Sequence, residues 1–294
     1  MAGETWIDLL DPSEERIRAH LPPDVSEHVV AQLLRGAPRP RLQALGDHVL
    51  GAFLVAVAVP AEDDVYYQEI DFFLDRGLLL TVRRTPPGRR PYDPAPVREA
   101  SREGDSPSLL LFRLTDHVAD RYLDIVDDLD SEIDELEDHL DEWEPPRVRD
   151  RLRRLRHQLL HVRRTLAPMR EAVRSIQEGR VELPGNDDLR ARFGTVHDIL
   201  LRAHDGIDLS RELLVSLADY HQARIANDVN QVVKRLTVVA SLILVPTFIV
   251  GLYGQNFRDM PEFSWGIWGY VWSWGLIVGS TLAQLAFFRW KRWL

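Results

Sequence analysis

The chain has 294 residues, enough for one large domain or two small ones. Hydrophobic residues make up 45% and charged residues 28%, a balance typical of folded rather than disordered chains. The absence of cysteine excludes disulfides and thiolate metal sites, and the net charge of −10 argues against a nucleic-acid partner, whereas a negative field concentrates cations.

The first part of the chain, residues 1–105, mixes strand and helix patterns and predicts an α+β domain with a mixed sheet. Ala52–Val59 is a continuous apolar run rich in β-branched residues, which suits a buried strand. Val65–Leu74 and Gly77–Arg83 predict two more strands. Asp75-Arg76-Gly77 separates these two strands.

One helix and one loop are also expected in this part. Asp24–Leu34 has helical periodicity, with Asp24 as the expected N-cap. Pro86–Pro96 is rich in proline and arginine and is predicted to be a loop.

Residues 106–235 are predicted to form long helices. The candidate helix Leu109–Trp143 carries 12 acidic residues and no lysine or arginine within Asp124–Glu144, and Pro145-Pro146 must end it. The next helix, from Arg147, holds eight arginines by Arg164. This pattern favours an antiparallel hairpin joined by ion pairs, and the alternative is a cation-attracting acidic face.

The last cytoplasmic helix is predicted to begin near Asp187 or Asp188 and to continue to Tyr253. Such a helix has about 65 residues and is roughly 100 Å long. Because a helix of this length is not stable alone, it indicates side-by-side packing with copies of itself.

Two membrane spans are predicted within residues 236–294. Leu236–Tyr253 and a second run at about 268–288 contain no charged residue and are long enough to cross a bilayer. Tryptophans cluster at both ends of the second run, as in an aromatic belt. Basic residues before the first span and after the second place both termini in the cytoplasm.

One spanning helix cannot enclose a pore, so transport requires several subunits. Helical spacing back from Asn256 selects a stripe that alternates small, polar and apolar side chains: Gly251, Thr247, Leu244, Ala240, Val233 and Asn230. The same composition also suits an ordinary helix–helix contact, and periodicity alone does not separate the two interpretations.

The end of the first span carries the most specific motif. Tyr253-Gly254-Gln255-Asn256-Phe257, followed by Met260-Pro261-Glu262, resembles the signature of the CorA family of magnesium transporters. Pro246-Thr247-Phe248-Ile249, Leu166–Glu171 and the basic ending Lys291-Arg292-Trp293-Leu294 resemble other segments of that family. The resemblance covers roughly residues 40–294.

The resemblance implies a funnel-shaped homopentamer with an outer filter at Gly254, Gln255 and Asn256. It implies polar rings at Thr247 and Asn230, apolar constrictions at Leu244, Val233 and Leu236, and an entrance at Asp219. Glu262 is expected to draw cations to the outer mouth, and a solvated surface carboxylate is the alternative. In the family, intracellular metal bound between cytoplasmic domains closes the pore. The candidate ligands here are Glu62, Asp63, Asp64 and Asp198, while Thr195 stands where the family often has another aspartate.

Ring-forming neutral oxygens have a physical rationale. Mg²⁺ holds its waters tightly, so carbonyl and amide oxygens that hydrogen-bond the hydrated ion allow it to enter and leave. Glycine at position 254 is expected to free its carbonyl for this role, and a plain helix C-cap is the alternative.

The expected function is Mg²⁺ uptake, with Co²⁺ and Ni²⁺ also accepted, across the plasma membrane. Divalent metal is the expected substrate and regulatory ligand, membrane lipid and copies of itself are the expected partners, and no cofactor is expected. Because Gln255 replaces the family's methionine, a ZntB-like Zn²⁺ transporter that uses a proton gradient is an alternative function. A membrane-anchored assembly protein that does not conduct is a further alternative, and an enzyme built on His157 and His161 lacks a third metal ligand.

Overall fold

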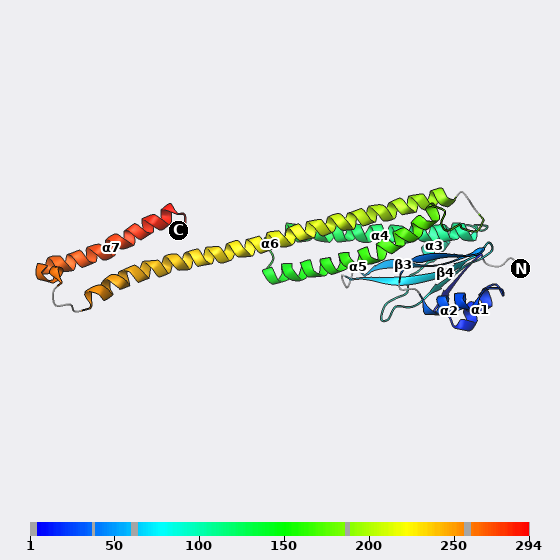
Figure 1. Cartoon of the computed structure of the whole chain (residues 1–294), viewed down its shortest axis with the longest axis horizontal. Coiled ribbons are helices and arrows are strands. Elements are labelled where there is room, and N and C mark those ends of the chain that lie inside the picture. Colours follow the sequence, from blue (N-terminus) through cyan, green and yellow to red (C-terminus); the bar gives the residue numbers. More distant parts are fainter. Residues whose placement is uncertain (1–4, 37–38, 60–63, 186–188, 256–259, 294) are drawn as a thin grey trace. The chain divides into compact units, whose positions relative to one another are not determined.

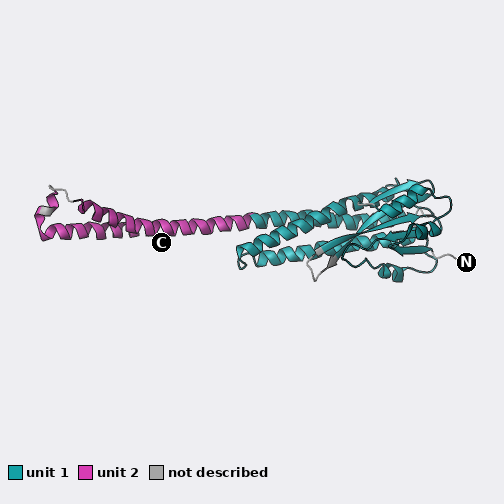
Figure 2. Ribbon diagram, turned by 90° about the horizontal axis from the view of Figure 1, so that it is seen from below, with its two compact units in different colours: residues 1–218 teal, residues 219–294 magenta. Residues whose placement is uncertain are grey.

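The computed structural model describes residues 5–36, 39–59, 64–185, 189–255 and 260–293. The chain divides into two compact units, residues 1–218 and 219–294 (Figure 2). The boundary between the units falls inside one helix, α6 (Leu189–Tyr253). The division by role into 1–105, 106–235 and 236–294 stays a prediction.

The first unit contains a five-stranded mixed sheet, as the sequence predicts. Its strands lie in the order β1-β5-β4-β3-β2; β1 is parallel to β5, and the other neighbours are antiparallel. Their bounds are Trp6–Leu10 for β1, Arg41–Leu45 for β2, His48–Val59 for β3, Asp64–Leu74 for β4 and Leu79–Arg83 for β5.

Helices cover both faces of this sheet (Figure 1). Helices α1 (Glu14–His20) and α2 (Glu27–Arg35) close one face over an apolar cluster that includes Ile17, Leu33 and Phe73. On the other face, α3 (Ala95–Ala100) and the long helices share a larger cluster with β3 and β4.

Two expectations about this region are wrong in detail. Helix α2 begins at Glu27 with Ser26 at its N-cap, because Asp24 lies in a turn in which the Val25 amide donates to the Pro22 carbonyl. The predicted loop at Pro86–Pro96 is also too long, since α3 begins at Ala95. There the Asp93 carboxylate accepts a hydrogen bond from the Ala95 amide at 2.9 Å.

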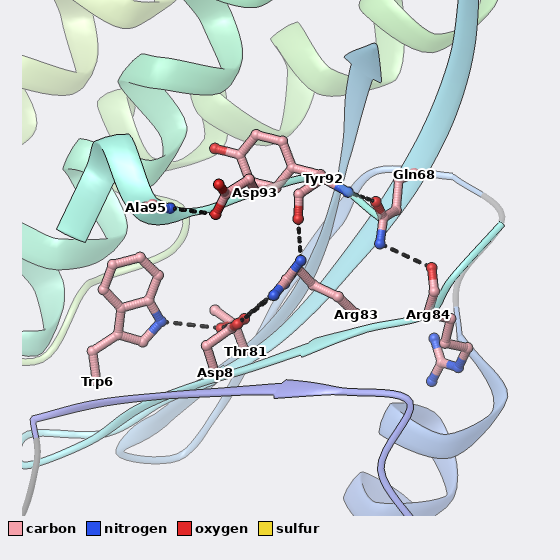
Figure 3. A network of polar contacts seen from close by, with 9 residues as sticks. All are labelled: Trp6, Asp8, Gln68, Thr81, Arg83, Arg84, Tyr92, Asp93 and Ala95. Atoms are coloured by element: carbon pink, nitrogen blue, oxygen red, sulfur yellow. Dashed lines mark hydrogen bonds and ion pairs between the residues drawn. The ribbon is translucent and has the colours of Figure 1, made fainter. Parts of the chain in front are cut away.

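A buried polar network fixes β1 against β5 (Figure 3). The Trp6 indole donates to the Thr81 hydroxyl at 3.0 Å, and that hydroxyl donates to Asp8 at 2.7 Å. Arg83 donates to Asp8 and to the Tyr92 carbonyl. The connection after β5 is thereby held to the sheet before the helical part begins.

The long hairpin has the predicted topology, and its first helix is shorter than expected. Helix α4 (Pro107–Asp138) begins after Ser106, whose hydroxyl accepts from the Leu109 amide at 3.3 Å. It ends before Trp143, and α5 (Pro145–Gln177) follows a turn. Both helices contribute to one apolar cluster, and Arg151 pairs with Glu132 at 3.2 Å.

The long helix predicted before the membrane part and the first predicted span form one helix, as the sequence indicates. Helix α6 runs for 65 residues to Tyr253, with Pro246 inside it. The predicted start at Asp187 or Asp188 lies outside the described residues. The 3-10 helix η1 (Pro261–Trp265) and helix α7 (Ile267–Trp290) complete the second unit. Both α6 and α7 contain segments long and apolar enough to cross a membrane.

Candidate functional site

Within the second unit, helices α6 and α7 each have one shielded face. On α6 the partly or fully buried positions recur every three or four residues: Val238, Ser241, Leu242, Val245, Pro246, Ile249 and Tyr253. On α7 they are Gly269, Ser273, Ile277, Ser280, Thr281, Gln284 and Phe288. Val238 is only 2% exposed and Phe288 only 6%. This spacing is that of two helices that shield each other along one face.

The predicted pore stripe occupies a different face of α6. With the predicted constriction Leu236 included, the stripe has seven members, and all are exposed in the single chain: Asn230, Val233, Leu236, Ala240, Leu244, Thr247 and Gly251. At 3.6 residues per turn, the centre of this stripe lies about 160° around the helix from the centre of the shielded face. The stripe therefore points away from α7 and is free to meet other copies or an aqueous path.

Thr247 is the hydroxyl-bearing residue in the membrane part of this stripe. Its O–H donates to the Ile243 carbonyl at 2.7 Å, so the hydroxyl proton is used inside the helix. The oxygen lone pairs remain on the exposed face. Thr247 can thus accept hydrogen bonds from the water around a cation.

The C-terminal end of α6 gathers neutral oxygen acceptors. The last turn tightens, since the Gly254 amide lies 3.0 Å from the Val250 carbonyl and 3.2 Å from the Gly251 carbonyl. The final carbonyls of a helix have no partner within it, and they form the negative end of its dipole. Gly254 and Gln255 are exposed at this end, which favours a cation. Asn256 lies outside the described residues.

The reason for glycine at position 254 differs from the expected one. Gly254 is not among the glycines with positive φ, so its backbone is open to other residues. An added Cβ at this position would lie 3.3 Å from the Val250 carbonyl oxygen. An unusual dihedral angle therefore does not require glycine at position 254, and a side chain there would need the Val250 carbonyl to shift by a few tenths of an ångström.

Glu262, the predicted outer-mouth residue, belongs to η1, and the backbone there lies against α7. A Cβ added to Gly269 would come within 2.2 Å of the Glu262 carbonyl oxygen, so only glycine fits. Gly266 joins η1 to α7 with φ +60°, which also favours glycine. The two glycines fix the position of Glu262 at the start of the second span.

The predicted regulatory ligands are not gathered in the described part of the single chain. Asp198 is 73% exposed on α6, with its carboxylate 3.9 Å from His197, and Asp219 is also exposed. Thr195 is also exposed. Glu62 and Asp63 lie outside the described residues, as does the side chain of Asp64. No group of three or more histidine or acidic side chains in the described ranges is arranged to hold a metal ion.

An acidic pair that the sequence reasoning missed lies on β4. Glu69 and Asp71 are two residues apart and so share one face of the strand. Burial, followed by the nearby charge of Asp71, raises the pKa of Glu69 from its usual 4.5 to about 8. Burial also raises the pKa of Asp71, opposed by Arg84, which donates to it at 2.7 Å. The i, i+2 spacing of two acids inside a strand was the available signal.

An α/β domain followed by a helix that continues into the first of two apolar helices defines a class of integral membrane protein with a large soluble part. The chain belongs to the CorA family: the model of the CorA-like Mg²⁺ transporter protein matches residues 2–292.

Individual relatives agree with this assignment. The chain is 30% identical over 185 residues to the cobalt/magnesium transport protein CorA of Thermotoga maritima, a match covering 63% of the chain and 52% of that protein. The match thus spans about half the length of this relative. The magnesium transport protein CorA of Salmonella typhimurium is 25% identical over 98% of the chain and 92% of its own length.

Solved structures share the fold. The complete CorA magnesium transporter from Methanocaldococcus jannaschii has a TM-score of 0.81 at 23% identity, covering 98% of this chain and 91% of that one. The ZntB cytoplasmic domain from Vibrio parahaemolyticus has a TM-score of 0.60 at 17% identity, covering 76% of this chain and 88% of that one. At these identities, the likeness extends to the fold alone.

Proposed function

We propose that this protein is a divalent-cation channel of the plasma membrane, that its principal ion is Mg²⁺, and that Co²⁺ and Ni²⁺ also pass. The observation that carries the proposal is the exposed stripe on α6, which lies about half a turn from the face shielded by α7 and leads to Gly254 and Gln255. A helix face with polar side chains at Asn230 and Thr247 costs free energy when it faces lipid, whereas it is well solvated when it faces water.

The stripe requires several copies to enclose a path. Five copies of α6 around an axis would place each stripe inward and each α7 outward, toward lipid. The names of the relatives, which are magnesium or cobalt/magnesium transport proteins, support this assignment. The basic residues beside the spans support a topology with both termini in the cytoplasm.

Conduction would rest on neutral oxygens. The carbonyls at the end of α6, with the amides of Gln255 and Asn256, would hydrogen-bond the water shell of the ion rather than replace it, which permits release. Glu262 would attract cations to the outer mouth. A divalent ion gains about 4.6 kcal/mol on moving inward across 100 mV, so no nucleotide is needed.

Intracellular metal would close the pore by linking neighbouring subunits. Asp198 is well placed for such a role because its carboxylate is exposed on α6 rather than engaged in the core. Glu62, Asp63 and Asp64 are the proposed partners across the interface, and Asp219 the proposed entrance. Loss of metal would leave carboxylates facing one another, and their repulsion would loosen the ring.

A ZntB-like zinc transporter is the second candidate. It is favoured by Gln255 in place of methionine and by the fold shared with a ZntB cytoplasmic domain. It predicts Zn²⁺ uptake that depends on a proton gradient and survives excess Mg²⁺. The channel predicts uptake that follows the membrane potential and is blocked by high internal Mg²⁺.

A flux assay in sealed liposomes separates the candidates. Purified protein is tested with Mg²⁺, Co²⁺, Ni²⁺ and Zn²⁺, with and without a pH gradient. Asn256→Ala is expected to remove most of the Mg²⁺ flux. Asn227→Ala, the same change on a face of α6 outside the stripe, is expected to leave it intact. Equal flux in both variants would reject the filter, and no flux of any divalent metal would reject the channel.

A further inference from the structure

A groove between α5 and α6 in the first unit has no role in the proposed pore. It encloses about 350 Å³, near the lower end of the range usual for small-molecule sites. The two helices run antiparallel here, and Arg163 of α5 pairs with Asp208 of α6 at 3.1 Å beside it. The groove is thus a defined cavity between two fixed helices.

The floor of the groove is aliphatic. Leu159 and Leu214 are almost fully buried beneath it, and Leu160 and Val215 also line it. No aromatic ring is among the lining residues. Such a floor suits a saturated hydrocarbon chain better than a planar ring, which would gain from stacking.

The rim of the groove is cationic. Arg149, Arg153 and Arg156 recur at three- and four-residue spacing on α5, and Arg211 lies across from them on α6. At this spacing the three guanidinium groups of α5 lie on one face of the helix.

These four arginines differ from others on the same helices. Arg151 pairs with Glu132, and Arg163 pairs with Asp208. Among the described residues, the four rim arginines have no ion pair and no hydrogen-bonded side-chain partner. Four uncompensated guanidinium groups around one apolar cavity make a positive field that an anion would relieve.

We propose that this groove binds a single-chain amphiphilic anion, with its hydrocarbon chain on the leucine floor and its carboxylate held by the rim arginines. Guanidinium groups bind carboxylates through two parallel hydrogen bonds, which gives both affinity and orientation. The volume of about 350 Å³ suits one chain of medium length rather than the two chains of a phospholipid. A fatty-acid anion is therefore the class of ligand that fits. The inference does not depend on ion conduction.

Photolabelling of the full-length protein in phosphatidylcholine nanodiscs tests the site. The probe is decanoate with a photoreactive diazirine at its methyl end, and labelled peptides are identified by mass spectrometry. We expect labels within residues 149–160 and 211–218. Excess decanoate or decyl phosphate should compete, whereas decanol, which lacks the charge, and acetate, which lacks the chain, should not.

Two sets of variants separate charge from shape. Arg153→Gln combined with Arg156→Gln is expected to reduce this labelling at least tenfold. Arg192→Gln combined with Arg202→Gln, which changes exposed arginines of α6 outside the groove, should leave labelling unchanged. Ala218→Trp should reduce labelling by filling the cavity. Thermal unfolding of each variant checks that the fold is retained.

Several outcomes would overturn the proposal. Labels confined to residues 219–294 would mean that the probe only partitions into the bilayer. Equal competition by decanol would remove the role of the arginines, and so would equal labelling of the two double variants. Displacement of the probe by added anionic phospholipid alone, and not by free decanoate, would assign the groove to a different occupant.

Discussion

Asp8 and Arg83 form a two-point ion pair across the parallel strands β1 and β5. The Arg83 Nη2 and Asp8 Oδ2 atoms are 2.6 Å apart, and Arg83 Nε lies 2.9 Å from Asp8 Oδ1 (Figure 3). Both side chains are less than a tenth exposed, so water screens the pair poorly. Arg83 also donates to the Tyr92 carbonyl, and the pair thereby links β1 to the segment that leads into the helices.

Asp8→Asn is expected to destabilise the protein by about 3–5 kcal/mol. The substitution leaves the buried charge of Arg83 without its counter-charge, which costs more than the pair itself contributes. Denaturant unfolding of the full chain in detergent measures the loss. Glu14→Gln, which breaks the exposed pair of Glu14 and Arg18, serves as the control and should cost less than about 1 kcal/mol. Equal losses of unfolding free energy in the two variants would show that the buried pair contributes no more to stability than the exposed pair.

The stability of the protein is expected to fall as the pH rises from about 4.5 to about 8. In this window Glu69 is ionised in the unfolded chain, whereas burial and the neighbouring charge of Asp71 keep its proton in the folded state. The folded state therefore binds more protons than the unfolded state, and the free energy of unfolding decreases with increasing pH. Arg84 and Arg41 oppose the shift without cancelling it.

Glu69→Gln tests this assignment, because glutamine resembles the protonated acid at every pH. We expect the variant to flatten the decline in unfolding free energy between pH 5 and pH 8. Glu103→Gln changes an exposed glutamate outside this cluster and should leave the profile of the parent protein. If the unfolding free energy declined equally with pH in Glu69→Gln and in the parent protein, a group other than Glu69 would hold the proton.

Much of the fold follows from patterns that act locally. The long apolar β-branched run of β3, the aromatic and aliphatic residues of β4, and the stretch without a helix-ending signal from residue 189 to Pro246 each predict one element. Strand β1 and the short edge strand β2 lack such a run. The place of β1 depends on long-range pairing with β5, whereas β2 is held by the hairpin that it forms with β3. The N-cap at Ser26 was missed because Ser26 and Asp24 are both good cap residues, and the turn after Pro22 decides between them.

The candidate site could also be predicted from the sequence only in part. Spacing along α6 could select the stripe, but the sequence could not separate a pore face from a helix contact. That the stripe lies about half a turn from the face shielded by α7 could be established only once the positions of both helices were known. The sequence likewise could not predict the arginine rim of the groove, formed by Arg149, Arg153, Arg156 and Arg211. A run of arginines on α5 does not reveal which of them face Glu132 and which face a cavity.

Thr247→Val is expected to reduce Mg²⁺ flux several-fold while it leaves folding unchanged. Valine has nearly the same shape but lacks the oxygen that faces away from α7, so a hydrated ion loses one acceptor in every subunit. The measurement is Mg²⁺ uptake into liposomes at a fixed potential.

Thr281→Val is a closely matched control for that variant. Thr281 is on α7, and its hydroxyl also donates to the carbonyl four residues earlier, that of Ile277, at 2.8 Å. The control should therefore lose the same intrahelical bond and retain its flux. If the two variants conduct alike, the oxygen of Thr247 does not face the ion.

Gly269→Ala is expected to disturb the outer mouth. A Cβ at this position would lie 2.2 Å from the Glu262 carbonyl oxygen, closer than any real contact, so η1 must move away from α7. Because the displaced atom is backbone, the shift would carry Glu262 with it. We expect lower Mg²⁺ flux and a lower midpoint of thermal unfolding. Gly275→Ala, also on α7, has open space around its Cβ position and should preserve both. Full flux in Gly269→Ala would show that the position of η1 does not control ion entry.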